Sequence, residues 1–370
     1  MSMVNTVIVF IIAVFFMIGI VDKAFLNNRL GLAQELESGV QQVGGLILSL
    51  VGIMCVAPLL GELLTPIVSP IYNLIGADPA NFSGIILGPD GGAFSITQSM
   101  TDNTEVLALS GLFLASMLGV TICFSLPFSL GVVEDKDRTD LSKGMLAGII
   151  ASPFGTVIAG LIAGFDIVFI LKSLSVAFII VILLVIALIK AQDAVIKGFL
   201  IFSKIISIIS LLSLGFASFE LLTGIKLIPG LDSIGDKLGT IGNMGITIGG
   251  ALCMVSVIQR LLKKPFKSLG KLLGINEVAV AGIIISLANA MPVYSMVKDM
   301  DKRGKILSIA FSVPACYALG SHLAFAATML PEYIFPEVIG KIICGMLAML
   351  VAYILFCRKD EEEIMEGEAS

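Results

Sequence analysis

The sequence predicts an all-α, polytopic membrane protein with about 9–11 transmembrane segments, arranged as two inverted repeats that contain re-entrant hairpins or broken helices. Hydrophobic residues make up 57% of the chain and charged residues 14%, whereas soluble domains carry roughly 25% charged residues. Mean hydropathy is +1.04. The 38 glycines agree with this class, because glycine is more frequent in transmembrane helices than in soluble ones. The lipid bilayer is therefore the first partner that the sequence predicts.

Apolar stretches long enough to cross a bilayer recur along the whole chain. A helix needs about 20 apolar residues to cross, and nine stretches come close to that length. The first has no basic residue before it and is followed by many others, so we expect a retained helix and not a cleaved signal. The predicted spans are 5–21, 43–61, 105–130, 142–164, 173–189, 198–221, 240–259, 304–327 and 338–357.

Two further apolar stretches, 81–100 and 277–297, are interrupted near their middles, at 88–92 and 288–292. Proline and paired glycines break the helical hydrogen-bond ladder. The loop 260–276, before the second stretch, carries five basic residues and no acids.

The loop 298–305, after the second stretch, carries four basic residues. Basic loops stay in the cytoplasm, so this stretch is expected to enter and leave the membrane on one side. The same reasoning makes 81–100 a hairpin from the outside, and 18 of the 23 basic residues are then cytoplasmic. The alternative is two broken helices that do cross.

An internal repeat appears when the chain is shifted by 198 residues, because the order and spacing of the segments then coincide. We expect a first repeat at 1–165, a linker span at 166–197, and a second repeat at 198–370 that ends in an acidic cytoplasmic tail. Five crossings separate equivalent positions, so the second repeat is inverted. Transporters built from inverted repeats bind substrate near the midplane, where discontinuous helices meet.

The residues at the two breaks are the first candidates for a substrate site. Asp90 lies at the first break, and a carboxylate at membrane depth costs at least ~2.5 kcal/mol and usually marks a function. Gly91 and Gly92 leave backbone groups accessible, and Asn289 at the second break can donate and accept hydrogen bonds. An acid beside open carbonyls suits a small cation, and an amide suits a hydroxyl. The alternatives are that Asp90 caps the next helical arm and that Asn289 is a turn residue.

Further candidates follow the breaks. Ser95, Thr97 and Gln98 come after the first break, where they contact substrate or make interhelical hydrogen bonds. The chain has no tryptophan, so Tyr294 is the best-placed aromatic face for an ammonium group. His322 lies inside a predicted span, where it carries a coupling proton or serves as a packing residue.

Other charged residues are expected at the membrane surface. Asp22 and Lys341 lie near the ends of predicted spans, so their side chains should reach the interface. Basic and apolar residues alternate over 260–273 in a helical pattern, which indicates an amphipathic helix in the cytoplasmic interface.

Several functional classes are excluded or weakened. The chain has no basic arm with interleaved aromatics, so nucleic acid is not an expected partner. The six cysteines form no CxxC pair, and a single histidine rules out a multi-histidine metal site. An intramembrane aspartyl protease needs two acids facing each other, and only Asp90 is clearly at depth. A channel or a structural scaffold stays open as an alternative.

Five motifs give the chain a resemblance to the ethanolamine-utilisation permease family, EutH, over nearly its whole length. They are FSLP at 124–127, LIPGLD at 227–232, LANAMP at 287–292, KDMDKRGK at 298–305 and ALGSHL at 318–323. One position departs from the expected family pattern, because Ser321 precedes His322 where an acid is expected. That departure weakens a proton relay through an Asp–His pair.

The resemblance implies a multi-pass protein of the bacterial plasma (inner) membrane that takes up ethanolamine for cytoplasmic breakdown. It implies no enzymatic activity and no cofactor. Ethanolamine is a small cation with a hydroxyl group, which matches Asp90 and Asn289. The energy coupling (none, proton or sodium) and a homo-oligomeric state are left open, as is transport of another small polar amine or ion.

Overall fold

The structure is a computed structural model that describes residues 3–358, with the backbone alone at residue 193 and at 262–269. The predicted acidic tail lies outside the described residues. The backbone of the predicted amphipathic segment 260–273 is helical within the long helix that ends at Leu273, but most of its side chains are not described.

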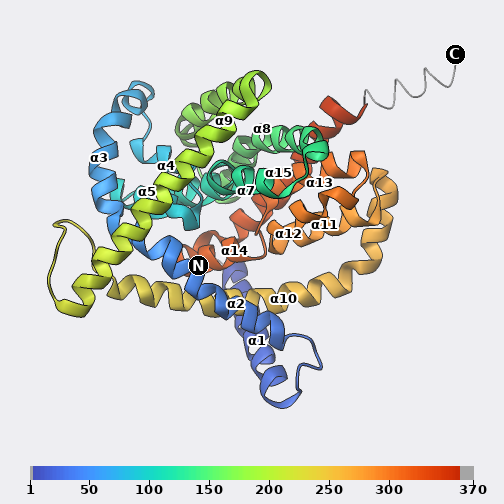
Figure 1. Cartoon of the computed structure of the whole chain (residues 1–370), viewed down its shortest axis with the longest axis horizontal. Helices are drawn as coiled ribbons and strands as arrows, with labels where there is room; N and C mark the ends of the chain where they lie inside the picture. The colour runs from blue at the N-terminus through green and yellow to red at the C-terminus, as the bar shows by residue number, and fades with distance from the viewer. Residues whose placement is uncertain (1–2, 359–370) are drawn as a thin grey trace.

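The described residues form helices joined by short loops (Figure 1). The α-helices are α1 (Met3–Phe25), α2 (Ala33–Leu46), α3 (Gly52–Ile75), α4 (Ser83–Ile86), α5 (Phe94–Met100), α6 (Thr104–Val106), α7 (Leu126–Val132), α8 (Arg138–Ile162), α9 (Ile167–Thr223), α10 (Gly235–Leu273), α11 (Glu277–Ala288), α12 (Met291–Met296), α13 (Lys302–Ala315), α14 (Ser321–Met329) and α15 (Ile334–Ala352). The π-helical stretches are η1 (Ile47–Val51), η3 (Pro89–Ala93), η4 (Leu107–Gly119), η5 (Thr121–Ser125) and η9 (Tyr353–Cys357). The 3₁₀ turns are η2 (Pro79–Phe82), η6 (Asp135–Asp137), η7 (Val297–Asp299) and η8 (Pro331–Tyr333).

Within residues 3–358, eight helices are long and apolar enough to cross a membrane. Eight of the nine predicted spans correspond to them. They are Met3–Phe25, Ala33–Ile75, Thr104–Val132, Asp135–Ile162, Ile167–Gln192, Ala194–Thr223, Gly235–Leu261 and Pro331–Cys357.

The ninth predicted span, 304–327, is not one helix. α13 ends at Ala315, and α14 begins at Ser321. Tyr317, between them, has φ +59°, and its backbone N–H donates to Ser286 O at 2.9 Å. The chain leaves the helix here because its amides bond to the last turn of α11. Such a break is tolerated at membrane depth only where protein buries it.

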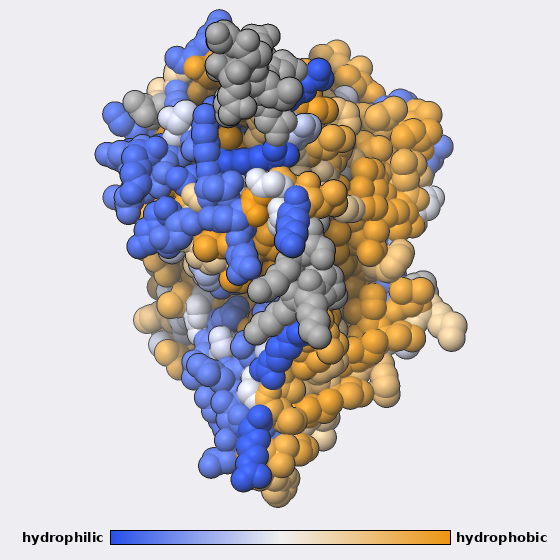
Figure 2. All heavy atoms as spheres, turned by 90° about the vertical axis from the view of Figure 1, so that its right-hand side faces the viewer, coloured by the Kyte–Doolittle hydropathy of each residue, from blue (hydrophilic) through white to orange (hydrophobic). Residues whose placement is uncertain are grey.

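Helix burial separates a core from a periphery. The span that contains η4 has 89% of its most apolar window buried, whereas the span Ala194–Thr223 has 11%. α8, α13 and α15 pack against one another, and α8 also packs on η4. Figure 2 shows a broad apolar surface beside a hydrophilic strip, as expected for a protein surrounded by lipid tails. The helices around η4 therefore form the interior of the molecule.

Both predicted breaks, at 88–92 and 288–292, are present. α4 stops at Ile86 and the chain resumes as η3, which contains Gly92 at φ +108°. A Cβ on Gly92 would lie 2.5 Å from Ile53 Cγ1, so this position requires glycine for conformation and for space. α11 stops at Ala288, and Asn289 is extended before α12 begins.

Equivalent contacts recur 198 residues apart. Ser110 Oγ donates to Asn81 O at 3.0 Å, and Ser308 Oγ donates to Ala279 O at 2.8 Å. α3 ends at the left-handed Gly76, and α10 ends at the left-handed Gly274, again 198 residues later.

α9 runs from Ile167 to Thr223 with a kink at Ala191 (φ −148°). It joins the predicted linker span to the second predicted repeat, so no loop marks the boundary at 197/198. The three predicted units 1–165, 166–197 and 198–370 stay predictions.

Asp22 is not at the surface, where the sequence predicts it. Asp22 is fully buried, and its carboxylate accepts backbone N–H bonds from Leu30 at 2.9 Å and Leu32 at 2.8 Å. The amides that leave α1 and enter α2 need an acceptor, and Asp22 supplies it.

We expect Gly119→Ala to lower the melting temperature of the purified protein. A Cβ at Gly119 would lie 1.9 Å from Leu87 O, at the first break, and overpacking costs roughly 1–3 kcal/mol. Scanning fluorimetry in detergent measures the effect. Gly131→Ala is the matched control, because no atom lies within 4 Å of a Cβ there. Equal melting temperatures for the two variants would contradict this packing.

Candidate functional site

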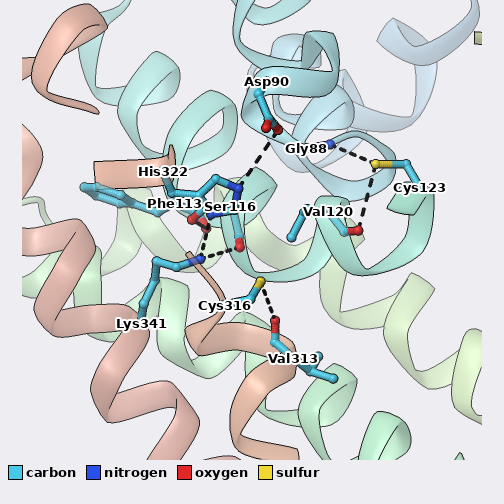
Figure 3. A network of polar contacts seen from close by, with 10 residues as sticks. All are labelled: Gly88, Asp90, Phe113, Ser116, Val120, Cys123, Val313, Cys316, His322 and Lys341. Atoms are coloured by element: carbon cyan, nitrogen blue, oxygen red, sulfur yellow. Dashed lines mark hydrogen bonds and ion pairs between the residues drawn. The ribbon is translucent and has the colours of Figure 1, made fainter. Parts of the chain in front are cut away.

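A chain of polar groups crosses the helical core from η3 to α15 (Figure 3). Asp90 Oδ1 lies 4.0 Å from His322 Nε2. On the other side of the ring, Lys341 Nζ lies 3.1 Å from His322 Nδ1. Lys341 also donates to Ser116 O. The predicted site residues Asp90 and His322 are thus neighbours, although they lie far apart in the sequence.

The first break positions the Asp90 carboxylate. The amide of Gly88, freed where α4 stops, donates to Cys123 Sγ at 3.3 Å, which fixes the turn against η5. Asp90 follows with a side chain that is 31% exposed. It is the accessible end of a cluster whose other charged groups, Lys341 and Glu337, are buried.

His322 lies in the first turn of α14 and is fully buried. A lysine ammonium only donates, so the bond from Lys341 makes Nδ1 the acceptor and assigns the ring proton to Nε2. That N–H faces Asp90 at a distance too long for a hydrogen bond, and Nε2 has no hydrogen-bond partner among the described residues. The geometry therefore leaves a donor and a carboxylate facing one another, 4.0 Å apart, without a hydrogen bond between them.

Lys341 lies inside the protein, so its predicted interfacial position is wrong. Its side chain is fully buried, because the helical span begins at Pro331 and not at 338. The acceptor, Ser116 O, belongs to the 13-residue π-helical stretch η4. π-helical turns are rare in proteins, and where they occur they often lie at functional sites.

Glu337 is a second buried carboxylate in the same region. It lies one helical turn before Lys341 on α15 and is 1% exposed. Its electrostatic neighbours are Lys341 and Asp90, and it lies beside Ser116. Neither carboxylate oxygen has a hydrogen-bond partner in the geometry of the described residues. A buried, ionised carboxylate without hydrogen bonds is costly.

Tyr317 connects the cluster to the second break. Its ring centroid lies 5.1 Å from that of His322, and its hydroxyl contacts the backbone of Ala290 and lies within electrostatic range of Asp90. A bulky residue at positive φ is a strained conformation that clusters at functional sites. Tyr317 thus places an aromatic ring beside His322 and near Asp90.

The predicted residues after the first break have separate environments. Thr97 is fully buried and bonds to Ala93 O and to Ser83, which is interhelical packing. Ser95 is buried too, whereas Gln98 is exposed. No described contact links these three to Asp90, so their substrate role stays a prediction.

No described bond links the predicted residues at the second break to Asp90 or His322, although Tyr294 lies within electrostatic range of Tyr317, so their substrate role stays a prediction. Asn289 Oδ1 accepts from Met291 N at 2.9 Å, as a turn residue does. Tyr294 is buried with its ring 6.0 Å from Phe128. At the first break, Gly92 is buried, whereas a Cβ on Gly91 would meet only one atom, 3.8 Å away. Of the two glycines at the first break, Gly91 is therefore the one with open space around it.

Sequence reasoning missed Lys341, Glu337, Ser116 and Tyr317. The available signal was the length of the last span, because an ionisable residue in the middle of a transmembrane helix is a functional candidate by default. A span counted from Pro331 would have placed Lys341 well inside it and away from both ends.

Comparisons with known proteins agree on one family. The profile of the family described as "Ethanolamine utilisation protein, EutH" matches residues 4–355. A "Probable ethanolamine permease EutH" of Listeria monocytogenes is 39% identical, covering 94% of this chain and 93% of that protein. A protein of the same name from Salmonella typhimurium is 36% identical over 99% of both chains.

A third relative, "Uncharacterized protein YxeR" of Bacillus subtilis, is 38% identical over 94% of both chains. No solved structure matches. The spans and these permease relatives together make the chain a multi-pass membrane protein. The chain belongs to the ethanolamine utilisation protein EutH family.

Proposed function

We propose that this protein takes up ethanolamine across the bacterial inner membrane as an alternating-access carrier or facilitator, with Asp90 as the carboxylate that binds the substrate ammonium. The observation that carries the proposal is the partly exposed Asp90 carboxylate at a helix break, facing Nε2 of His322, which has no hydrogen-bond partner among the described residues. The names of the permease relatives support the same substrate.

The Asp90–His322 pair suits the two polar ends of protonated ethanolamine. Asp90 accepts the ammonium group in a charge-assisted hydrogen bond. The Nε2–H of His322 donates to the hydroxyl oxygen, and the Tyr317 ring offers a face to the cation. Asp90 Oδ1 and His322 Nε2 are 4.0 Å apart, so ethanolamine would lie alongside the pair, with its ammonium group bonded to Asp90 and its hydroxyl to His322.

A second candidate function is transport of another small polar amine or ion, by a carrier or a channel. The same carboxylate serves any small cation, and only the His322 donor selects for a hydroxyl group. Ethylamine lacks the hydroxyl group. Its competition with labelled ethanolamine for uptake separates an ethanolamine transporter from a transporter of small cations in general.

We further propose that the two broken segments are re-entrant hairpins of inverted repeats. The hydrogen bonds of Ser110 and Ser308, displaced by 198 residues, support the repeat. So do the left-handed glycines that end α3 and α10. The basic loops on both sides of 277–297 support the entry of this segment from the cytoplasm.

We expect Asp90→Asn to lower ethanolamine uptake and the apparent affinity at least tenfold. The variant keeps the size and the capping ability of the side chain but removes the charge, and hydrogen bonds to charged groups contribute about 1.5–3 kcal/mol. Initial uptake of labelled ethanolamine into proteoliposomes measures the loss.

Two controls accompany this variant. Asp90→Glu keeps the charge and should retain part of the activity. Glu62→Gln removes an exposed carboxylate on α3 and should transport normally. Near-normal uptake by a well-folded Asp90→Asn protein would mean that Asp90 is only structural.

We expect cysteines introduced by Lys271→Cys and Lys298→Cys to react with an impermeant maleimide from the cytoplasmic side alone. Both lysines are exposed and flank the segment 277–297. Lys226→Cys, in the loop between α9 and α10, is the control that should react only from outside, and the unsubstituted protein gives the background. Labelling of Lys271→Cys and Lys298→Cys from opposite sides would show that the segment crosses.

A further inference from the structure

Glu337 is the one buried carboxylate of the cluster to which substrate binding assigns no task. Resting on the function proposed above, we propose that Glu337 is a proton-binding site and that ethanolammonium bound at Asp90 displaces this proton, so that substrate and proton exchange one for one. The site is distinct from the substrate carboxylate, because Glu337 belongs to α15 and Asp90 to η3.

The charges of the cluster carry the inference. Asp90 and Glu337 together bring two negative charges and Lys341 brings one positive charge, so the fully ionised cluster has a net charge of about −1 when His322 is neutral. An uncompensated charge at membrane depth is energetically costly. One added positive charge removes this cost. It arrives either as the substrate ammonium at Asp90 or as a proton on a carboxylate.

Environment decides which carboxylate takes the proton. Asp90 is 31% exposed, so it stays partly hydrated when ionised. Glu337 is 1% exposed, and the hydroxyl of the neighbouring Ser116 donates to Phe113 O, which leaves both carboxylate oxygens without a donor within hydrogen-bond geometry among the described residues. The unsolvated carboxylate pays the larger cost of ionisation. The proton therefore resides on Glu337 when the substrate is absent.

Lys341 connects the two carboxylates. Its bond to His322 Nδ1 directs the ammonium toward the Asp90 side, and Glu337 lies four residues earlier on the same helix face. Without substrate, the ammonium balances Asp90. With substrate on Asp90, it balances an ionised Glu337.

The other titratable groups around Glu337 and Lys341 are two thiols and one imidazole. Cys316, before α14, and Cys344, on α15, interact with the Lys341 ammonium, and His322 bonds to it. The groups that face Glu337 electrostatically are Lys341 and Asp90. The two thiols and the imidazole are neutral in this scheme. The charge balance therefore depends on Asp90, Glu337 and Lys341 alone.

The exchange is balanced in charge. When the ammonium of ethanolamine binds Asp90, the O–H bond of Glu337 breaks and its proton passes to water. The cluster is neutral before and after. Transport is then electroneutral, and binding competes with protons.

Binding to the purified protein in detergent tests the proposal. Calorimetric titration with ethanolamine, in two buffers of different ionisation enthalpy near pH 7, should give about one proton released per molecule bound. Ethanolamine stays protonated at this pH, so the proton comes from the protein. The Kd should rise about tenfold for each pH unit of acidification.

Glu337→Gln should bind more weakly, release no proton, and have a Kd independent of pH over the range in which Asp90 is ionised. Glu337→Asp should keep the proton release. The matched control is Glu332→Gln, an exposed acid on η8, which should behave as the unsubstituted protein.

Three outcomes would overturn the proposal. They are binding without proton release in the unsubstituted protein, unchanged proton release in Glu337→Gln, and uptake into proteoliposomes that an inside-negative voltage accelerates. The voltage measurement needs no variant, so it decides even if Glu337→Gln does not fold. Absence of ethanolamine binding to the folded, unsubstituted protein would instead contradict the proposed function.

Discussion

A lysine ammonium buried among apolar helices imposes the central constraint on this structure. Lys341 is fully buried on α15, and a charge at that depth persists only with partners. Its two hydrogen bonds go to a carbonyl of the π-helical stretch η4 and to His322. The second bond assigns the histidine proton to the nitrogen that faces Asp90. One buried cation thus orients the donor and offsets the charge of the proposed substrate carboxylate.

Interrupted helices bring these groups together. Asp90 lies where α4 gives way to η3, and His322 and Tyr317 lie where α13 gives way to α14. The last turn of α11, before the interruption after Ala288, supplies the carbonyls that accept from the amides of Tyr317 and Leu319. Continuous helices would keep these polar backbone groups bonded internally. The breaks therefore create both the position of the carboxylate and the strained conformation of Tyr317.

Local signals predicted the spans, the breaks and two of the site residues. Apolar run length and proline or glycine content depend on neighbouring residues alone, so the spans and the interruptions at 88–92 and 288–292 could be predicted. Asp90 stood out by its depth. Tyr317 did not, because its positive φ depends on a bond to Ser286, which is distant in sequence. The segment 304–327 has the length and hydropathy of a single span, but Pro314 and Gly320 lie on either side of the break at 316–320 and were the signal available in the sequence.

Determination of the structure by cryo-electron microscopy, with and without ethanolamine, tests the account most directly. We predict that ethanolamine lies between Asp90 and His322, with its ammonium group against the carboxylate, its hydroxyl at Nε2, and the Tyr317 ring beside it. Lys341 should remain bonded to Ser116 O. Ethanolamine bound away from Asp90, or a Lys341 side chain that reaches the membrane interface, would contradict the account.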